Sequence, residues 1–365
     1  MRKFIFTVCL LFFVAFMPLT AQEKPSVKIG VAGLVHDHVH WILRQAKEGK
    51  VQMVGIAEPN RDLAQRYADQ YGFSMDIVYP DLESMLEASK PEAVTAFNTI
   101  KDHLAVVQAC APKGIDVMVE KPLAIDMSDA REMAKLAKEY DIEVLTNYET
   151  TWYPSNHQAF AEVHEHNSVG ELRKVVVRDG HEGPKEIGVS EEFLSWLTDP
   201  EMNGGGALVD FGCYGANLIT WLMKGQRPQS VTAIVQQVKP DVYPKVDDEA
   251  TIIVTYPKMQ GVIQASWNWP FGRKDMSVYG ETGYVYALNA EEMKLRKADE
   301  QEQEIKASDE SITYEDPFEY LSAVVRKEVV VKPTDLSSLE NNLIVVEILD
   351  AAKLSASSGS TIFLR

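Results

Sequence analysis

Apolar residues in the first half of the chain occur in short runs, and stretches with a helical repeat separate these runs. A short apolar run is typical of a buried strand, whereas apolar residues spaced three and four apart predict a helix. Strands that alternate with helices favour a parallel, doubly wound sheet of the α/β class. We expect strands at 27–32, 51–57, 93–97, 114–119 and 142–146, and helices that begin at residue 39 or span 61–71, 82–88, 103–111 and 129–140.

The pattern changes after Asn147, because several strand-like segments follow one another with few helices between them. Successive strands without intervening helices indicate a large, mostly antiparallel sheet. We expect strands at 171–178, 231–238, 250–256, 261–267, 276–279 and 284–288, a closing helix at 339–355 and a final strand at 361–364. The chain is therefore predicted to have two domains, at 25–147 and 148–365.

The first residues have the composition of an export signal. Arg2 and Lys3 precede an apolar run at 4–17, and Ala21 supplies a small residue at the expected cleavage site. The run is short for a transmembrane span, and an uncleaved anchor is the alternative. We expect a signal peptide at 1–21 and a mature protein that begins near Gln22, is periplasmic or otherwise exported, and has no membrane segment.

The charge and the cysteine content of the chain indicate which kinds of binding partner and which kinds of cysteine chemistry to expect. The full chain carries a formal charge of −18, which argues against nucleic acid or anionic lipid and favours small or neutral ligands. Beyond the expected signal, the cysteines are Cys110 and Cys213, both in apolar contexts. We expect buried thiols, since the sequence has neither a disulfide framework nor a zinc-binding spacing.

A charged pair followed by proline stands at the C-terminal end of the strand predicted at 114–119. Glu120 and Lys121 precede Pro122, and a helical pattern follows. The C-terminal ends of strands line the ligand crevice in open α/β sheets, and proline keeps the preceding residue extended. The segment is therefore a candidate site, with an ordinary turn and a solvated ion pair as the alternative.

The turn after the first strand is where a dinucleotide-binding fingerprint of three glycines would lie. Only Gly33 is in place, because Val35 and His38 occupy the second and third glycine positions. Glu58 ends the second strand, close to the usual spacing of ~20 residues, where a carboxylate bonds the ribose hydroxyls and disfavours a 2′-phosphate. The pattern favours NAD over NADP, with a solvated loop acid as the alternative for Glu58.

Alternate histidines follow the same turn, at His36, His38 and His40. This spacing resembles the metal ligands at a barrel strand end in amidohydrolase-type metalloenzymes, where neutral imidazoles suit zinc. On a helix, however, only His36 and His40 share a face, and no further histidine–aspartate set follows. We therefore expect no metal, and assign these histidines to a helix terminus or to the cofactor site.

A glycine-rich segment in the second half carries further candidate chemistry. The three glycines at 204–206 allow a close backbone approach, and Asp210 and Tyr214 share one face if the segment is helical. A carboxylate beside a phenol can bond a polyol and exchange a proton with it; the alternative is an acidic helix cap beside a buried tyrosine. Trp152, clustered with Tyr153, either stacks on a sugar ring or packs in the core.

Taken together, these motifs resemble the Gfo/Idh/MocA oxidoreductases over nearly the whole mature chain. The resemblance is carried by the turn at 30–33, Glu58, Asn98-Thr99 with His103, Glu120-Lys121-Pro122, the triple-glycine segment, and the closing helix followed by Gly359. It implies a Rossmann domain followed by an α/β domain whose open sheet makes homodimer or homotetramer contacts. It also implies hydride transfer between a nicotinamide and a carbon of a sugar or polyol.

On this resemblance, Lys121 matches a lysine between the nicotinamide and the substrate hydroxyl, where its charge stabilises a developing alkoxide. Asp210 matches a substrate-binding aspartate. Tyr214 replaces a histidine of many members and is similar to the glucose–fructose oxidoreductase and dihydrodiol dehydrogenase branch; a phenol, with a pKa of about 10, needs Lys121 nearby to act as a base. The expected NAD contacts are Gly33, Val35, His36, His38, Glu58, Asn98, Thr99, His103, Glu120 and Lys121, and the expected substrate contacts are Lys121, Trp152, Asp210 and Tyr214.

The chain departs from the family pattern at two places. Val35 and His38 leave less room for the pyrophosphate, which His38 could contact directly, and the segment 147–154 lacks an arginine common there. Free NAD is scarce outside the cytoplasm, and the N-terminus lacks a twin-arginine signal. We therefore expect an exported oxidoreductase that acts on a sugar, polyol or glycoside with tightly bound, recycled NAD. The alternatives are an NAD-dependent, redox-neutral glycosidase and a carbohydrate-binding relative without activity.

Overall fold

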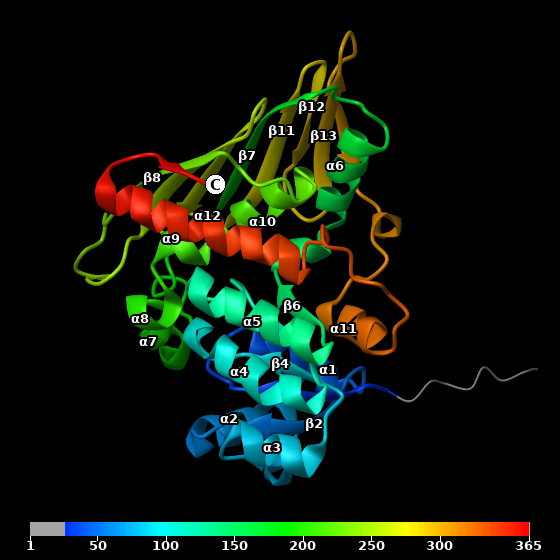
Figure 1. Ribbon diagram of the computed structural model, residues 1–365, viewed down its shortest axis with the longest axis vertical. Helices are drawn as coiled ribbons and strands as arrows, with labels where there is room; N and C mark the ends of the chain where they lie inside the picture. Colours follow the sequence, from blue (N-terminus) through cyan, green and yellow to red (C-terminus); the bar gives the residue numbers. More distant parts are fainter. Residues whose placement is uncertain (1–25, 365) are drawn as a thin grey trace, which may run out of the picture.

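The computed structural model describes residues 26–364, in which two sheets lie one above the other along the long axis of the molecule (Figure 1). The predicted signal peptide at 1–21 lies outside the described residues. Between residues 26 and 364, no helix combines the length and the apolar character that a membrane span requires.

The first sheet is parallel, as predicted, and its strand order is β3-β2-β1-β4-β5-β6. The direction of winding reverses between β1 and β4, and in such folds the ligand crevice lies at the C-terminal ends of the strands near this point. The short strand β3 was not predicted, because two residues carry no pattern. The strands are β1 (Lys28–Ala32), β2 (Gln52–Ala57), β3 (Val78–Tyr79), β4 (Ala93–Ala96), β5 (Asp116–Glu120) and β6 (Val144–Asn147).

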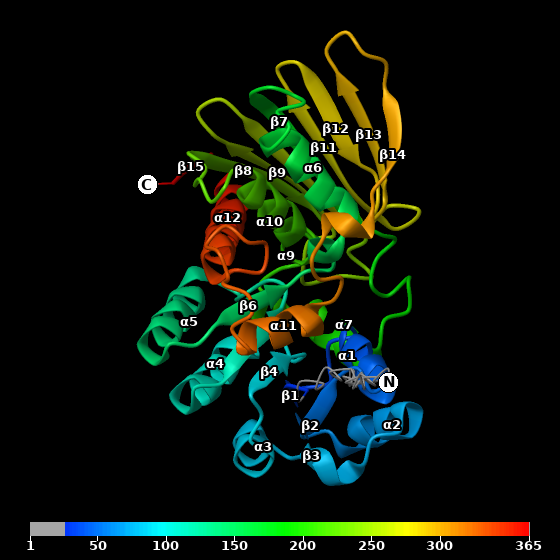
Figure 2. The ribbon, with the colours of Figure 1, turned by 90° about the vertical axis from the view of Figure 1, so that its right-hand side faces the viewer.

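Helices cover both faces of this sheet, with α1 and α2 on one side and α3, α4 and α5 on the other (Figure 2). Side chains cap their ends: Asn60 accepts a hydrogen bond from the Leu63 N–H at the start of α2, and Asp126 does the same for Ser128 at the start of α5. Gly72, with φ of 83°, ends α2. The helices are α1 (Val39–Lys47), α2 (Arg61–Tyr71), α3 (Leu82–Ser89), α4 (His103–Cys110) and α5 (Met127–Tyr140).

The second sheet has nine strands in the order β14-β13-β12-β11-β7-β10-β9-β8-β15 and is mostly antiparallel, as predicted; β7 and β10 are a parallel pair. Strands β13 and β14 were not predicted, and β11 begins three residues earlier than expected. The strands are β7 (Leu172–Gly180), β8 (Ser230–Gln236), β9 (Glu249–Thr255), β10 (Gln260–Ser266), β11 (Arg273–Gly280), β12 (Gly283–Ala287), β13 (Glu292–Lys297), β14 (Gln303–Lys306) and β15 (Ile362–Phe363).

One face of the second sheet is covered by helices and the other is open (Figures 1 and 2). The long helix α12 packs on β8 and α10, and α10 packs on β7 and β10. The helices of this half are α6 (Pro154–His164), α7 (Glu191–Leu197), α8 (Pro200–Asn203), α9 (Ala207–Asp210), α10 (Gly212–Leu222), α11 (Pro317–Val325) and α12 (Leu339–Ser358).

The glycine-rich segment is two helices and not one, because α9 ends at Asp210 and α10 begins at Gly212. Gly206 lies so close to Asp247 that an added Cβ would stand 1.8 Å from its carbonyl oxygen. Glycine is therefore required for this close approach. The break leaves Asp210 at the C-terminal end of α9 and Tyr214 in the first turn of α10.

The helix α11 returns to the first sheet although it lies late in the sequence. Its buried residues Phe318, Leu321 and Val324 belong to the core that contains Ile29 of β1, and Phe318 packs edge-on against Trp41 of α1. The core beside the first sheet therefore contains residues from both halves of the chain.

Candidate active site between the two sheets

Lys121, directly after β5, meets the end of α9 from the second half of the chain. Its Nζ lies 2.5 Å from Asp210 Oδ1 and 3.2 Å from the Asp210 carbonyl oxygen. The second carboxylate oxygen of Asp210 accepts a hydrogen bond from Trp267 Nε1 at 2.9 Å. All three side chains are buried, so the predicted contact of Lys121 with Asp210 is present in a fully partnered, water-excluded cluster.

The charges of this pair support each other. Burial is the largest effect and disfavours the ammonium of Lys121, but the charge and hydrogen bond of Asp210, together with the charges of Cys213 and Glu120, raise the pKa of Lys121. Burial likewise disfavours the carboxylate, yet Lys121 lowers the pKa of Asp210. Both groups are therefore ionised at neutral pH, which places a fixed positive charge at the C-terminal end of β5.

Tyr214 lies beside two ammonium groups, because Lys121 Nζ is 5.3 Å and Lys274 Nζ is 4.8 Å from its ring centroid. Burial nevertheless raises the pKa of Tyr214 well above its usual value, and the charge of Glu149 adds to the shift. The role of Tyr214 as a base that depends on Lys121 stays a prediction, and burial of the phenol opposes it in this arrangement. The hydroxyl is protonated and suits hydrogen-bond donation.

Glu120 is the centre of a second buried cluster, on the side of the first sheet. Its carboxylate lies 2.9 Å from His38 Nδ1 and accepts a hydrogen bond from Asn147 Nδ2 at 2.8 Å. Burial opposes ionisation, but His38 leads the contributions that lower the pKa of Glu120. Trp152 Nε1 donates to Asn147 Oδ1, and its ring packs 5.8 Å from that of Tyr320. Trp152 thus supports this cluster and packs in the core.

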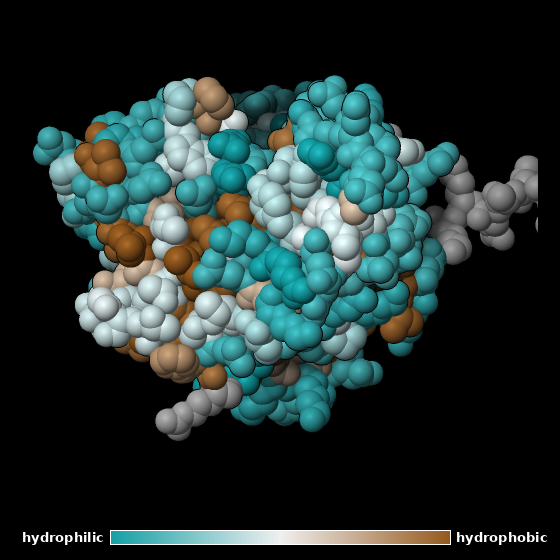
Figure 3. All heavy atoms as spheres, turned by 90° about the horizontal axis from the view of Figure 1, so that it is seen from above, coloured by the Kyte–Doolittle hydropathy of each residue, from teal (hydrophilic) through white to brown (hydrophobic). Residues whose placement is uncertain are grey.

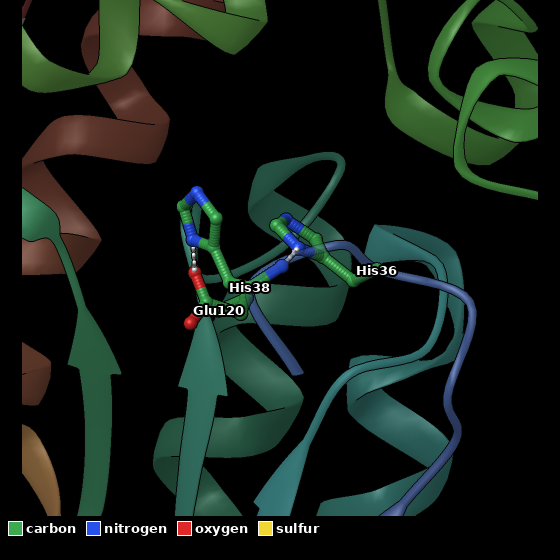
Figure 4. Close-up of side chains that lie close together, drawn as sticks. All are labelled: His36, His38 and Glu120. Atoms are coloured by element: carbon green, nitrogen blue, oxygen red, sulfur yellow. Dashed lines mark hydrogen bonds and ion pairs between the residues drawn. The ribbon is translucent and has the colours of Figure 1, made fainter. Parts of the chain in front are cut away.

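His36 and His38 stand together at the end of the first strand–helix turn, next to Glu120 (Figure 4). Each of the three side chains offers one possible metal-ligand atom, and these atoms lie within 4.8 Å of one another. His36 Nδ1, however, already accepts a hydrogen bond from the His38 N–H at 3.1 Å. His40 does not join this group, because its ring bonds the Tyr71 hydroxyl. The histidines that lie together are therefore His36 and His38, and not His36 and His40, which would share a face of a helix.

The turn that carries the degenerate glycine fingerprint is tightly fixed. Gly33 has a φ of 81°, and an added Cβ would lie 2.8 Å from the Asn98 Cβ, so the turn requires glycine. The carboxylate of Glu58 accepts hydrogen bonds from the Leu34 and Asn60 N–H groups, both at 2.8 Å. Glu58 therefore links the ends of β1 and β2 by hydrogen bonds. A ribose hydroxyl that bonded Glu58 would share the carboxylate oxygens with these two backbone N–H groups.

The other predicted cofactor residues include two buried acceptors that the protein leaves open. Asn98 Oδ1 and His103 Nε2 have no hydrogen-bond partner among residues 26–364. His103 Nδ1 bonds the Leu123 carbonyl oxygen, and burial lowers the pKa of His103 to about 4, so its Nε2 is a neutral acceptor. Thr99 instead donates to Asp102 in the loop before α4. Open acceptors beside the strand ends fit the hydroxyl and carboxamide donors of a nicotinamide dinucleotide.

A short helix from the second half covers this turn. Trp196 of α7 donates to the Val35 carbonyl oxygen at 3.1 Å, and the rings of Phe193 and His36 lie 4.5 Å apart. The Ser190 N–H, just before α7, bonds the Asp37 carboxylate at 2.9 Å. The turn at Val35, His36 and Asp37 is therefore packed against α7 and the residue before it.

Sequence reasoning missed four charged or aromatic residues of the site: Glu149, Asp179, Trp267 and Lys274. Lys274 bonds Glu149, which also accepts from the Tyr153 hydroxyl. Asp179 and Lys274 face each other on β7 and β11. Their strands were predicted or partly predicted, but a polar residue on a strand carries no signal of the face and neighbour that it will have.

Two family models match the chain and together span most of it. The model described as an oxidoreductase family with an NAD-binding Rossmann fold matches residues 27–148, and that described as the GFO/IDH/MocA C-terminal domain matches residues 157–286. Among curated relatives, trans-1,2-dihydrobenzene-1,2-diol dehydrogenase of Sus scrofa is 24% identical over 261 residues, which are 71% of this chain and 72% of the relative.

Solved structures share the fold at low sequence identity. An aldose-aldose oxidoreductase from Caulobacter crescentus complexed with glycerol has a TM-score of 0.78 and 18% identity, with 93% of this chain and 100% of that chain covered. An inositol dehydrogenase homologue from Azotobacter vinelandii complexed with NAD⁺ has a TM-score of 0.77 and 16% identity, with 93% and 97% covered. The resemblance inferred from the sequence is thus confirmed: the chain belongs to the Gfo/Idh/MocA family of NAD-binding oxidoreductases.

Proposed function

We propose that this protein transfers a hydride between NAD and a hydroxyl-bearing carbon of a sugar, polyol or glycoside. The observation that carries the proposal is the buried Lys121–Asp210 pair at the end of β5, beside Tyr214 and next to the open acceptors of the cofactor side. The named substrate of the Sus scrofa relative is a diol, and the Caulobacter structure contains glycerol. Both are neutral molecules with neighbouring hydroxyl groups, which suits an acidic protein.

In this proposal, Lys121 binds the reacting oxygen and stabilises the negative charge that develops on it. Asp210 holds the Lys121 ammonium in place, and Trp267 fixes the carboxylate. Tyr214 donates a hydrogen bond to the same oxygen. NAD, when bound, supplies the hydride acceptor or donor.

The protonation state of the site favours one direction of proton transfer. Lys121 and Tyr214 both have raised pKa values and are protonated at neutral pH. Such a site can give a proton to the oxygen of a carbonyl group as the hydride reaches its carbon, whereas oxidation of a hydroxyl needs one of the two groups to be deprotonated first so that it can take the hydroxyl proton. We therefore propose that reduction is part of the working cycle, as recycling of one NAD requires.

Export and cofactor retention are proposed together. Residues 1–21 carry the signal composition described above, and a protein outside the cytoplasm gains from a cofactor that does not leave. The packing of α7 against the first turn, through Trp196, Phe193 and Ser190, supports retention because this turn belongs to the expected cofactor site. Mass spectrometry of the ligand released on denaturation is expected to find NAD, and a single turnover is expected to leave NADH bound; release of free NADH would contradict retention.

We also propose that the open face of the second sheet joins two copies of the chain. Seen from above in Figure 3, apolar side chains gather between polar ones at this end of the molecule. On the open face, Tyr284 and Tyr286 stack with ring centroids 4.5 Å apart, and Ile253 and Val262 are only partly buried. Light scattering is expected to give a dimer or tetramer for the wild type and a smaller species for Ile253→Glu; a monomeric wild type would refute this arrangement.

Turnover with a panel of hydroxylated probes tests the central proposal. The NAD-loaded protein is expected to oxidise or reduce at least one of glycerol, myo-inositol, D-glucose and methyl glucosides. The variants Lys121→Ala and Tyr214→Phe are expected to lose that turnover while they keep bound NAD. Unchanged turnover in both variants would remove Lys121 and Tyr214 from the mechanism.

A further inference from the structure

Asp179 differs from the other buried carboxyl groups of residues 26–364. It is 1% exposed, and neither carboxyl oxygen has a hydrogen-bond partner among the described residues. The five other buried carboxylates each accept at least two hydrogen bonds: Glu58, Glu120, Asp210, Asp248 and Asp275. An unpaired buried carboxyl destabilises a fold, so a chain that keeps one gains something else from it.

Asp179 adjoins the catalytic cluster. It lies on β7 directly opposite Lys274 of β11, on the face that α10 covers. Lys274 Nζ is 4.8 Å from the ring centroid of Tyr214, and Lys121 Nζ is 5.3 Å from the same centroid. The open carboxyl and its neighbouring ammonium are therefore one side chain away from the group expected to bind the reacting hydroxyl.

Lys274 connects this buried carboxyl with solvent. Its ammonium bonds Glu149, whose side chain is 41% exposed, while that of Lys274 is 21% exposed. Burial opposes the charge of Glu149, but Lys274 lowers the pKa of Glu149 to about 2, so this carboxylate is ionised at neutral pH. Burial raises the pKa of Asp179 well above its usual value, against the effect of Lys274. A protonated carboxyl both donates and accepts a hydrogen bond, as a sugar hydroxyl does.

We propose that Asp179, together with Lys274 and Glu149, binds the substrate hydroxyls next to the reacting one and so determines specificity for polyhydroxylated molecules. The inference rests on the proposed function, and it adds Asp179, Lys274 and Glu149 to the residues that bind the substrate. The substrate parts the Glu149–Lys274 pair as it enters, and its hydroxyls supply the partners that Asp179 lacks. A molecule with a single hydroxyl gains none of these contacts.

Thermal unfolding of the NAD-loaded protein is the first test, because it requires no known substrate. Asp179→Leu is expected to raise Tm by at least about 2 °C, since it removes an unpaired buried polar group and keeps the same number and branching of side-chain heavy atoms. Asp275→Asn is the matched control on the opposite face of β11, where the carboxylate bonds Arg178 and Arg273. This control is expected to lower Tm. A lower Tm for Asp179→Leu would overturn the proposal, because it would mean that the carboxyl serves the fold.

Kinetics with glycerol, myo-inositol and D-glucose are the second test. Asp179→Asn is expected to raise KM for the best of these probes by about tenfold or more with little change in kcat, because ground-state contacts are lost. Asp275→Asn is expected to keep the wild-type KM. An unchanged KM for Asp179→Asn would overturn the specificity role alone. A wild type that neither turns over nor is stabilised by any probe would instead count against the proposed function, and the melting comparison would still decide on Asp179.

Discussion

The two carboxylates at the base of the crevice, Asp210 and Glu120, differ in the cation that each one holds. Asp210 is paired with Lys121, and both side chains are 6% exposed. Glu120 is paired with His38, whose side chain is 32% exposed, while its own is 2% exposed. A buried ammonium is a permanent charge, whereas an imidazole can be neutral or charged. In the proposed function, the Lys121–Asp210 pair lies where an alkoxide would develop, and the His38–Glu120 pair lies on the side where the cofactor would bind.

Removal of Lys121 is expected to have the largest effect. Lys121→Met should lower kcat by about 10³-fold, because the developing charge loses its stabilising cation. It should also lower the free energy of unfolding by about 3–5 kcal/mol, because Asp210 is left buried without its partner. Activity assays and urea unfolding measure the two effects separately.

The double variant Lys121→Met/Asp210→Asn is the control for this prediction. It is expected to recover much of the stability, since no unpaired charge remains, and none of the activity. Recovery of activity in the double variant would show that Lys121 acts only by neutralising Asp210.

Tyr214→Phe is expected to have the next largest effect, a loss of about 10²-fold in kcat, if the hydroxyl donates to the reacting oxygen. Tyr148 supplies a matched control, because its ring lies 5.5 Å from that of Tyr214 and its buried hydroxyl has no partner among residues 26–364. Tyr148→Phe should change kcat by less than about twofold. Equal losses in both variants would mean that packing, not proton donation, is being measured.

More of the fold than of the candidate site could be predicted from the sequence. The parallel order of the first sheet follows from alternating strands and helices, and Lys121 could be placed at a strand end because Pro122 marks it. The partnership of Lys121 with Asp210 came from family resemblance, since 89 residues separate them. The break between α9 and α10 at Phe211 gave no signal in the sequence pattern.

The substrate-side neighbours could not be predicted from local pattern. Lys274 and Glu149 are 125 residues apart, and Asp179 is opposite Lys274 only because β7 and β11 pair in one particular register. A shift of either strand by one residue would turn its side chain to the open face and separate the two. Such contacts depend on the register of strands that are distant in sequence, which hydrophobic periodicity does not specify.

The next largest effect should be on the pH dependence of stability, which should distinguish the Asp210 pair from the Glu120 pair. The pKa values of both Asp210 and Glu120 are lowered, so each contributes stability above the unfolded carboxyl pKa of about 4 and loses it as pH falls further. The pKa of Lys121 is raised, so its contribution is complete below about pH 10 and is lost as pH rises through the folded value. Lys121→Met/Asp210→Asn should therefore flatten both ends of the profile, whereas Glu120→Gln should flatten mainly the acid end, because Glu120 makes the smallest of the contributions that raise the pKa of Lys121. A Glu120→Gln profile that changes as much at high pH as at low pH would break this distinction.

The smallest expected effects come from the two indoles that support these clusters. Trp267 donates directly to the carboxylate of Asp210, whereas Trp152 donates to the amide oxygen of Asn147, which in turn bonds Glu120. Hydrogen bonds to a charged group contribute about 1.5–3 kcal/mol and those between neutral groups about 0.5–1.5 kcal/mol. Trp267→Phe should therefore destabilise the protein more than Trp152→Phe does, as measured by urea unfolding.

The same two variants should also have different effects on turnover and on NAD binding. Trp267→Phe is expected to lower kcat with little change in NAD affinity, because Asp210 positions Lys121 beside the reacting oxygen. Trp152→Phe is expected to weaken NAD binding with little change in kcat, because its hydrogen-bond chain ends at Glu120 and His38. Since each substitution replaces one indole by a phenyl ring and removes one N–H donor, the reversed pattern would mean that the substrate and cofactor sides have been assigned the wrong way round.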